Sequence, residues 1–258
     1  MTPLPVRKAI LFAAAGTSYA DAMKTFEGIG LAAAARFPGI PQRWAYTSSG
    51  VRRKLAARGV HVDDPAQALA AMTAEGFTHI AVLSLHLAEG MEYRELAETV
   101  RSHSDRARLS PPFLTNEQDA RRILSALLAS LPAEVAGDDA IILVAHGSLE
   151  PKAIETLHAT VSLCRQVDRR LNLGMILGSP SLRDIVADCK AASVKKVWLV
   201  PFLLSAGFSV QEEIAGAGDK SWKTTLEQAG FKCVPVLKGL GDVDGIVRVW
   251  LDRLEQLL

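Results

Sequence analysis

The sequence predicts an α/β protein made of two similar halves, each a parallel sheet flanked by helices, with a cleft between the halves. Short apolar runs alternate along the chain with longer helical patterns, which is typical of parallel βαβ units. The same order of runs occurs twice within 258 residues. A segment rich in Pro, Gly and Asp, residues 131–139, separates the two occurrences. We therefore expect one half at residues 1–135 and the other at residues 136–258.

The first half is expected to open with a strand at residues 9–14, because this short apolar run precedes a longer helical pattern. A longer segment, at about residues 19–37, has the length and pattern of a helix. The remaining elements are expected as a strand at 42–46, helical stretches up to 75, a strand at 79–85 and, before the linker, a helix at 116–131.

The second half repeats this order. Its first strand is expected at residues 140–145, again an uninterrupted apolar run. The elements that follow are a helix at about 151–171, a weaker strand near 174–178, a helix at about 182–192, a strand at 196–202, a third apolar run at 233–237 and a closing helix at about 243–257. The repetition predicts a duplicated unit.

The end of the first strand differs between the halves. In the second half His146 and Gly147 follow the apolar run directly, whereas in the first half Gly16, Thr17 and Ser18 follow it without a histidine. Ligands of open α/β sheets bind at the carboxyl ends of the strands. We therefore take His146 as the principal candidate for a functional residue, at the position where the halves have diverged.

A second pair of strand ends can be aligned on glycine. The stretch after Leu85 and the stretch after Phe202 each end their strand at a small residue plus glycine, and each leads into an expected helix. In this alignment Glu92 and Ser209 occupy equivalent places. Both are expected to face the cleft at the carboxyl edge of their sheet.

Composition excludes several classes of partner. Apolar residues make up 49% of the chain, the formal net charge is +1, and no basic cluster with interleaved aromatic residues occurs, so a nucleic-acid partner is not expected. No apolar run reaches the roughly 20 residues of a membrane span, and residues 1–8 lack the apolar stretch of a signal peptide. We expect a protein of the cytoplasm without a membrane partner.

The three cysteines are far apart and odd in number. Cys164, Cys189 and Cys233 form no CxxC spacing, so neither a disulfide framework nor a thiolate metal site is predicted. We expect them to behave as small buried apolar side chains.

Several motifs together resemble the class II chelatases of tetrapyrrole biosynthesis, and most closely the anaerobic cobaltochelatases of the CbiK type, which insert Co²⁺ into sirohydrochlorin. The resemblance covers nearly the whole chain. The motifs that carry it are Gly16-Thr-Ser-Tyr19, Thr47-Ser48 with Arg52-Arg-Lys-Leu55, Leu85-His86-xxx-Gly90-x-Glu92-Tyr93, Ala145-His146-Gly147, and Asp219-Lys-Ser-Trp222-Lys223 with Leu237-x-Gly239-Leu-Gly241.

The resemblance implies two flavodoxin-like, chelatase-like halves with a tetrapyrrole cleft between them. It implies a metal site that draws on His146 and Glu92, a divalent metal as substrate (Co²⁺, with Fe²⁺ or Ni²⁺ as alternatives), and no organic cofactor. Gly16, Thr17 and Ser18 are then expected to bind a carboxylate of the macrocycle through backbone N–H groups and the Ser18 hydroxyl. The oligomeric state is left open.

The sequence departs from the family pattern at three places. Where members typically read Ala-Gly-Asp-His, this chain reads Ala206-Gly-Phe208-Ser209, so the second metal-binding histidine of the family is missing. The other departures are Gly178-Ser-Pro-Ser181 and Ser148-Leu-Glu-Pro-Lys152. A serine hydroxyl is a weak ligand for such metals, so we expect weak metal affinity in the absence of tetrapyrrole. Phe208 would make the cleft wall more apolar and favour stacking on a flat ring.

The other histidines and a basic run have simpler interpretations. His86 lies within an apolar strand and is interpreted as a buried, hydrogen-bonded histidine rather than a ligand. The remaining histidines, at positions 61, 79, 103 and 158, are assigned to surface or helix positions. The basic residues at 52–54 are interpreted as a solvated helix face, with steering of ring carboxylates as the alternative.

The leading hypothesis is a chelatase that inserts a divalent metal into a tetrapyrrole, with His146 as principal ligand and Glu92 as second ligand or proton acceptor. The alternative is a non-catalytic tetrapyrrole- or haem-binding protein derived from a chelatase, in which His146 is an axial ligand. A third hypothesis is a small-molecule binding module of the periplasmic type, since such modules also have two α/β halves about a cleft.

Overall fold

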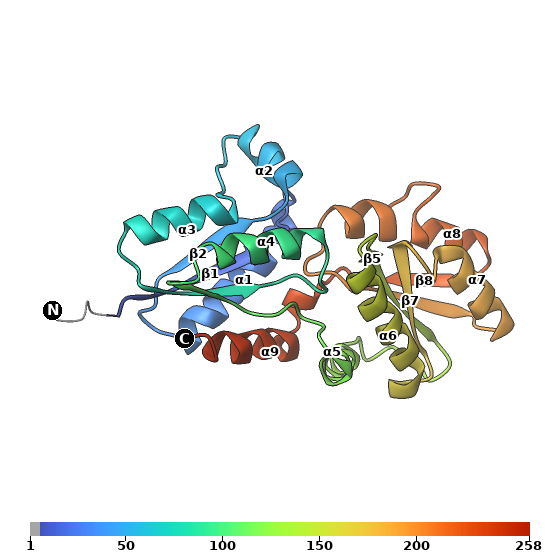
Figure 1. Cartoon of the computed structure of the whole chain (residues 1–258). Coiled ribbons are helices and arrows are strands. Elements are labelled where there is room, and N and C mark those ends of the chain that lie inside the picture. The colour runs from blue at the N-terminus through green and yellow to red at the C-terminus, as the bar shows by residue number, and fades with distance from the viewer. Residues whose placement is uncertain (1–5) are drawn as a thin grey trace.

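The computed structural model describes residues 6–258, and the start of the chain at residues 1–5 lies outside the described part. Within residues 6–258 the strands form two four-stranded parallel sheets, with the orders β2-β1-β3-β4 and β6-β5-β7-β8 (Figure 1). The two orders are the same once the second set is renumbered, so the expected duplication of a parallel α/β unit is confirmed. No helix of the described residues is long and apolar enough to cross a membrane.

The first sheet and its helices come from the first part of the chain. Its elements are β1 (Lys8–Ala14), α1 (Ala20–Arg36), β2 (Gln42–Tyr46), α2 (Ser49–Ala56), α3 (Pro65–Ala74), β3 (His79–Ser84), α4 (Met91–Arg101), β4 (Ala107–Leu109) and α5 (Glu117–Ala129). The expected strands at 9–14, 42–46 and 79–85 are all present. Strand β4 was not expected, because its three residues are too few to show a period.

The second sheet follows the linker. Its elements are β5 (Ala140–Gly147), α6 (Pro151–Val167), β6 (Leu171–Leu177), α7 (Leu182–Ala191), β7 (Lys196–Pro201), the π-helix η1 (Ser209–Ile214), α8 (Trp222–Gln228), β8 (Lys232–Pro235), the short 3-10 helix η2 (Leu240–Asp242) and α9 (Asp244–Glu255).

The second strand of this half begins earlier than expected. Helix α6 ends at Val167 because Asp168 leaves the helical region, with φ −150° and ψ 127°. The Asp168 carboxylate accepts hydrogen bonds from the backbone N–H and the guanidinium of Arg170, which fixes the turn. Strand β6 therefore starts at Leu171, where Ile141 of β5 is its partner.

The central strands are buried on both faces. Every residue of β1 from Ala9 to Ala14 is completely buried, as are Ile141 to Val144 of β5. A strand covered on both faces needs a continuous apolar run rather than an alternating one, which is why these two runs could be recognised in the sequence. The three cysteines are likewise buried, as expected.

Helices α5 and α9 are exchanged between the halves (Figure 1). Helix α5 precedes the linker but packs against α6 of the second half, while α9 closes the chain and packs against α1 and β3 of the first. Trp250 of α9 stacks on Phe113 with ring centroids 4.3 Å apart. His79, which was assigned to a surface or helix position, is instead the half-buried first residue of β3. Its Nε2 atom lies 2.6 Å from the carbonyl oxygen of Leu257 in the chain's last turn. The exchanged helices hold the two sheets in one fixed arrangement.

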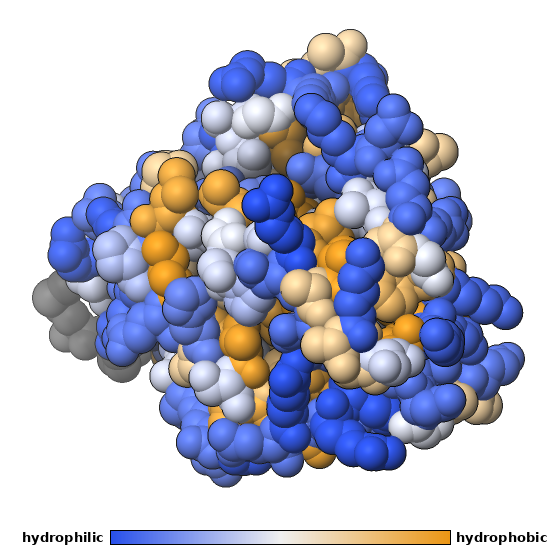
Figure 2. Space-filling view, turned by 90° about the vertical axis from the view of Figure 1, so that its right-hand side faces the viewer, coloured by the Kyte–Doolittle hydropathy of each residue, from blue (hydrophilic) through white to orange (hydrophobic). Residues whose placement is uncertain are grey.

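The outer surface of the second half is mixed in polarity. Figure 2 shows hydrophobic residues reaching this surface between hydrophilic ones. Eight large apolar side chains of the described residues are exposed, and five of them lie at or shortly after the carboxyl end of a strand: Met91, Leu149, Leu177, Phe208 and Leu237. Exposed apolar side chains therefore concentrate at the strand ends.

Candidate functional site

The carboxyl edges of the two sheets meet. A Cβ placed on Gly207, which follows β7, would lie 3.0 Å from the Thr17 hydroxyl, which follows β1. The rings of Tyr19 and Phe208 are in edge contact with centroids 6.3 Å apart, although they belong to different halves. Between the edges lies a cavity of about 230 Å³ with mostly apolar walls. This is the place where ligands of open α/β sheets bind.

His146 lies on the wall of this cavity. It is the next-to-last residue of β5, its side chain is exposed, and its Nδ1 atom lies 3.4 Å from the Gly147 carbonyl oxygen. Gly147 has φ +84°, and a Cβ there would lie 1.7 Å from the Leu177 carbonyl oxygen. Only glycine can make this turn against β6, so the His-Gly pair sets the direction in which the chain leaves the strand.

Glu92 lies in the first turn of α4, where the positive end of the helix dipole favours a carboxylate. Its Oε2 atom accepts a hydrogen bond of 2.8 Å from the Thr47 hydroxyl and lies 3.6 Å from Nε2 of His86. Burial alone would raise the pKa of Glu92, but hydrogen bonds from His86 and Thr47 and the nearby charge of Arg52 outweigh it and lower this pKa. The Glu92 carboxylate is therefore ionised at neutral pH.

The structure places Glu92 and His146 on different cavities. Glu92 lines a separate polar pocket of about 210 Å³, together with Thr47, Arg52 and Asp64. His86 lines the cavity that contains His146 and contacts Glu92 on its other side. His86 is thus the link between the two candidate residues.

His86 has hydrogen-bond partners on both ring nitrogens. Its Nδ1 atom is 3.0 Å from the Ser84 hydroxyl, and its Nε2 atom is 3.1 Å from the Thr47 hydroxyl. Its side chain is only 11% exposed. The expectation of a hydrogen-bonded histidine is met, but the residue is only partly buried, and its contact with the cavity was missed. The sequence feature that could have revealed this contact is the position of His86, two residues after the end of β3. The segment that carries Glu92 follows the same strand end.

A third pocket, of about 560 Å³, opens beside the strand-end turn that carries Ser18. Its wall includes Tyr19 and Phe208, the latter 51% exposed, and two cations of the first half. Lys54 lies with Nζ 5.5 Å from the Phe208 ring centre, and Arg58 donates a hydrogen bond of 2.7 Å to the Ser18 carbonyl oxygen. Within residues 6–258 neither cation has a carboxylate at ion-pair distance. The pocket can accept an anionic, partly aromatic group.

The strand-end turn itself is only partly available to a ligand. Gly16 has φ +87°, and a Cβ there would lie 2.4 Å from the Tyr46 ring. Thr17 is buried, and its hydroxyl accepts a hydrogen bond of 3.2 Å from the backbone N–H of Tyr19. Ser18 lines the pocket, whereas Ser209 begins the π-helix η1. Of the three turn residues, Ser18 is the one best placed to contact a ligand.

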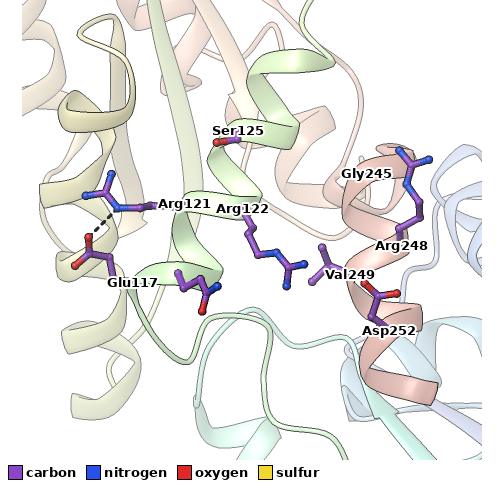
Figure 3. A pocket seen from close by; sticks show the side chains of 9 residues that line it. Glu117, Arg121, Arg122, Ser125, Gly245, Arg248, Val249 and Asp252 are labelled. Atoms are coloured by element: carbon purple, nitrogen blue, oxygen red, sulfur yellow. Dashed lines mark hydrogen bonds and ion pairs between the residues drawn. The ribbon is translucent and has the colours of Figure 1, made fainter. Parts of the chain in front are cut away.

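A groove between α5 and α9 lies apart from these cavities (Figure 3). It has a volume of about 830 Å³, and its walls carry Arg121, Arg122 and Arg248. Arg121 is paired with Glu117 at 2.7 Å, as the dashed line in Figure 3 marks. None of the candidate residues lines this groove, which is the seam between the exchanged helices.

The described residues contain no group of three or more His, Cys, Asp or Glu side chains close enough to hold a metal ion. The side chains of Thr47, His86 and Glu92 are in mutual contact, and only two of them are of these four residue types. His146 lies on the wall of the same cavity as His86. Any ion held by protein alone would therefore be held by few strong ligands.

Comparison with known proteins gives a family and a fold. The family model described as cobalt chelatase (CbiK) matches residues 8–258. The sirohydrochlorin cobaltochelatase CbiKC of Nitratidesulfovibrio vulgaris is 38% identical over 253 residues, which are 96% of this chain and 89% of the relative. The sirohydrochlorin cobaltochelatase of Salmonella typhimurium is 28% identical over 260 residues, with 98% and 97% of the two chains covered.

Solved structures agree on the fold. SirB from Bacillus subtilis with Fe³⁺ superposes with a TM-score of 0.66 at 14% identity, covering 98% of this chain and 96% of SirB. CbiX, described as the terminal enzyme for siroheme biosynthesis in denitrifying bacteria, gives a TM-score of 0.55 at 17% identity over 97% and 99% of the two chains. The expected chelatase-like arrangement of two α/β halves is confirmed.

Proposed function

The chain belongs to the CbiK cobalt chelatase family, and we propose that it inserts a divalent metal ion, Co²⁺ in the first place, into sirohydrochlorin. The observation that carries the proposal within the molecule is the position of His146. It stands at the carboxyl end of β5, on the wall of a largely apolar cavity, where the edges of both sheets meet. The names of the two relatives support sirohydrochlorin as the macrocycle and cobalt as the metal.

Insertion of a divalent ion requires a ligand that can hold and release the ion, and an acceptor for the two pyrrole N–H protons that leave the ring. An imidazole suits Co²⁺, Fe²⁺ and Ni²⁺, and we assign this role to His146. Glu92 is the proposed second ligand or proton acceptor, since its carboxylate is ionised and half-buried. The two charges of the ion replace the two protons, so the ring's net charge is unchanged.

The ring itself would be seated by the apolar side chains at the strand ends. Phe208 and Leu149, both largely exposed, supply surfaces that a flat macrocycle can cover. The acidic side chains of sirohydrochlorin would meet Lys54 and Arg58 in the pocket beside Ser18. We also propose a location in the cytoplasm, no organic cofactor, and a division of the chain near residue 135.

A second candidate function is a non-catalytic tetrapyrrole carrier. It is supported by our interpretation that Ser209 occupies the place where the family pattern has a histidine. It is also supported by the absence, within residues 6–258, of a group of three or more His, Cys, Asp or Glu side chains that could hold a metal ion. In a carrier, His146 would serve as an axial ligand to the metal of a finished complex. The two candidates differ in turnover: a chelatase accelerates metal insertion into the ring, whereas a carrier binds the ring without accelerating insertion.

The deciding experiment mixes the metal-free protein anaerobically with sirohydrochlorin and, separately, with protoporphyrin, and follows the visible spectrum after Co²⁺ or Fe²⁺ is added. We expect insertion into sirohydrochlorin faster than in the protein-free control, and loss of that acceleration in His146→Ala. Binding of the ring without faster insertion would establish the carrier. Unchanged insertion in His146→Ala would refute the assignment of His146.

A further inference from the structure

We propose that the groove between α5 and α9 binds a small molecule with two or more linked anionic groups, of the oligophosphate or polycarboxylate kind. The groove lies apart from the cavities of the candidate site, and its ligand binding can be measured without any tetrapyrrole. The inference therefore does not depend on the proposed function. The residues that carry it are Arg122 of α5 and Arg248 of α9.

These two arginines have no partner within residues 6–258. Most arginines of this range donate to a carboxylate, a side-chain oxygen or a backbone carbonyl oxygen. The exceptions, whose side chains make no hydrogen bond and no ion pair, are Arg101, Arg122, Arg183 and Arg248. Two of these exceptions line the same groove although they lie on different helices. Guanidinium groups pair strongly with carboxylates and phosphates, so two unengaged ones on one groove indicate a place for an anion.

The carboxylates on the groove walls are already engaged. Glu117 lies 2.7 Å from Arg121, and Asp252 lies 2.7 Å from Arg36 of α1. The walls carry three arginines and two carboxylates, which leaves an excess of positive charge in the groove. Neither carboxylate is at ion-pair distance from the two unengaged arginines, so an incoming anion would not have to displace it.

Neutral donors lie on the same stripe of α5 as Arg122. Gln118, Arg122 and Ser125 are spaced i, i+4 and i+7, so they share one face of the helix. The side chains of Gln118 and Ser125 are exposed and make no hydrogen bond within the described residues. Figure 3 shows Arg122 extending from α5 into the space between the two helices. The stripe covers about 10 Å of helix, long enough for a ligand with two linked anionic groups.

The opposite wall, on α9, closes the base of the groove. A Cβ placed on Gly245 would lie 3.2 Å from the Cβ of Ala126 on α5, so the two helices approach closely at this glycine. Val249 adds an apolar surface beside Arg248. The volume of about 830 Å³ falls within the roughly 300–1,000 Å³ of small-molecule sites and is larger than a single phosphate needs.

A ligand in this groove would bridge the exchanged helices. Helix α5 packs against α6 of the second half, and α9 packs against α1 and β3 of the first. An anion that contacts Arg122 and Arg248 together would therefore link the two halves. Because the unfolded chain has no such groove, the bound anion would also stabilise the folded state.

The test is binding of inorganic tripolyphosphate and, separately, of citrate to the metal-free full chain, measured by calorimetry. We expect Arg122→Gln and Arg248→Gln each to weaken binding about fivefold or more. The matched controls are Arg101→Gln and Arg183→Gln, which remove the same charge from exposed, unengaged arginines outside the groove and should leave binding unchanged. Binding of tripolyphosphate alone would assign the site to phosphates, and binding of citrate alone to carboxylates. No binding of either anion at millimolar concentration overturns the proposal.

Two further results would also overturn it. Equal weakening in the controls would show a general attraction to the charge of the protein. Loss of binding in Lys54→Gln with Arg58→Gln, but in neither groove variant, would place the anion in the pocket beside Ser18.

Thermal unfolding gives a second readout on the same variants. Saturating anion should raise the Tm of the parent chain and leave that of the double variant, Arg122→Gln with Arg248→Gln, nearly unchanged. An equal rise in both overturns the proposal. Failure of metal insertion would leave the anion site standing, and failure of anion binding would leave the proposed function standing.

Discussion

The turn after His146 depends on the absence of a side chain at the next residue, so Gly147→Ala tests how the site is built. Gly147 has φ +84°, a conformation that costs an alanine roughly 1–2 kcal/mol. The new Cβ would also lie 1.7 Å from the Leu177 carbonyl oxygen, about half of an ordinary contact distance. Relieving such an overlap in packed structure costs about 1–3 kcal/mol. Together these terms predict a loss of about 2–5 kcal/mol in the free energy of unfolding.

The matched control is Gly39→Ala. Gly39 has φ +78°, but a Cβ there would meet nothing within 4 Å, so only the conformational cost of about 1–2 kcal/mol applies. Both variants are compared with the parent chain by urea unfolding. Gly147→Ala should lose clearly more than Gly39→Ala, and its binding of sirohydrochlorin should weaken because His146 and the end of β6 are displaced. Equal losses in the two variants would show that the contact with Leu177 does not constrain the turn.

Three further results are expected. Trp250→Ala should lower the free energy of unfolding by about 3–5 kcal/mol in urea, since the ring is 1% exposed and joins α9 to the first half; a loss below 1 kcal/mol would mean that the exchanged helix contributes little. Asp139 is buried, which would raise its pKa, but hydrogen bonds from Trp198, Ala136 and Lys196 lower it. Its contribution is therefore complete above about pH 4 and lost as the pH falls through the lowered value, so Asp139→Asn should flatten the acid limb of a stability–pH curve; an unchanged limb would contradict this. Lys54→Ala with Arg58→Ala should raise KM for sirohydrochlorin and leave kcat nearly unchanged in steady-state insertion assays, whereas an unchanged KM would place the ring's carboxylates elsewhere.

The central strands could be located in the sequence because each is an uninterrupted apolar run. Such runs occur at β1 and β5, which are completely buried over most of their length. The exchange of α5 and α9 could not be predicted in the same way. An amphipathic pattern shows that a helix has a buried face, but not which of two similar sheets will cover it. Only the long-range contacts, such as Trp250 on Phe113, decide that.

The candidate site shows the same limit. His146 was recognisable because it interrupts the end of a strand, and this information is local. The contact of His86 with Thr47 and Glu92 is not local, since 39 residues separate Thr47 from His86. It arises because β2 and β3 flank β1 in one sheet, which brings their carboxyl ends to the same edge. A sequence interpreted one strand at a time assigns such a residue to the core.

The duplication explains why the functional groups are divided between the halves. At equivalent strand ends the first half has Gly16 and the pair His86–Glu92, while the second has His146 and the pair Phe208–Ser209. Under the proposed function, His146 at the end of β5 presents the ion to the ring, Glu92 after β3 accepts protons, and the remaining two ends seat the macrocycle. The asymmetry between the halves would then separate delivery of the metal from binding of the ring within one fold.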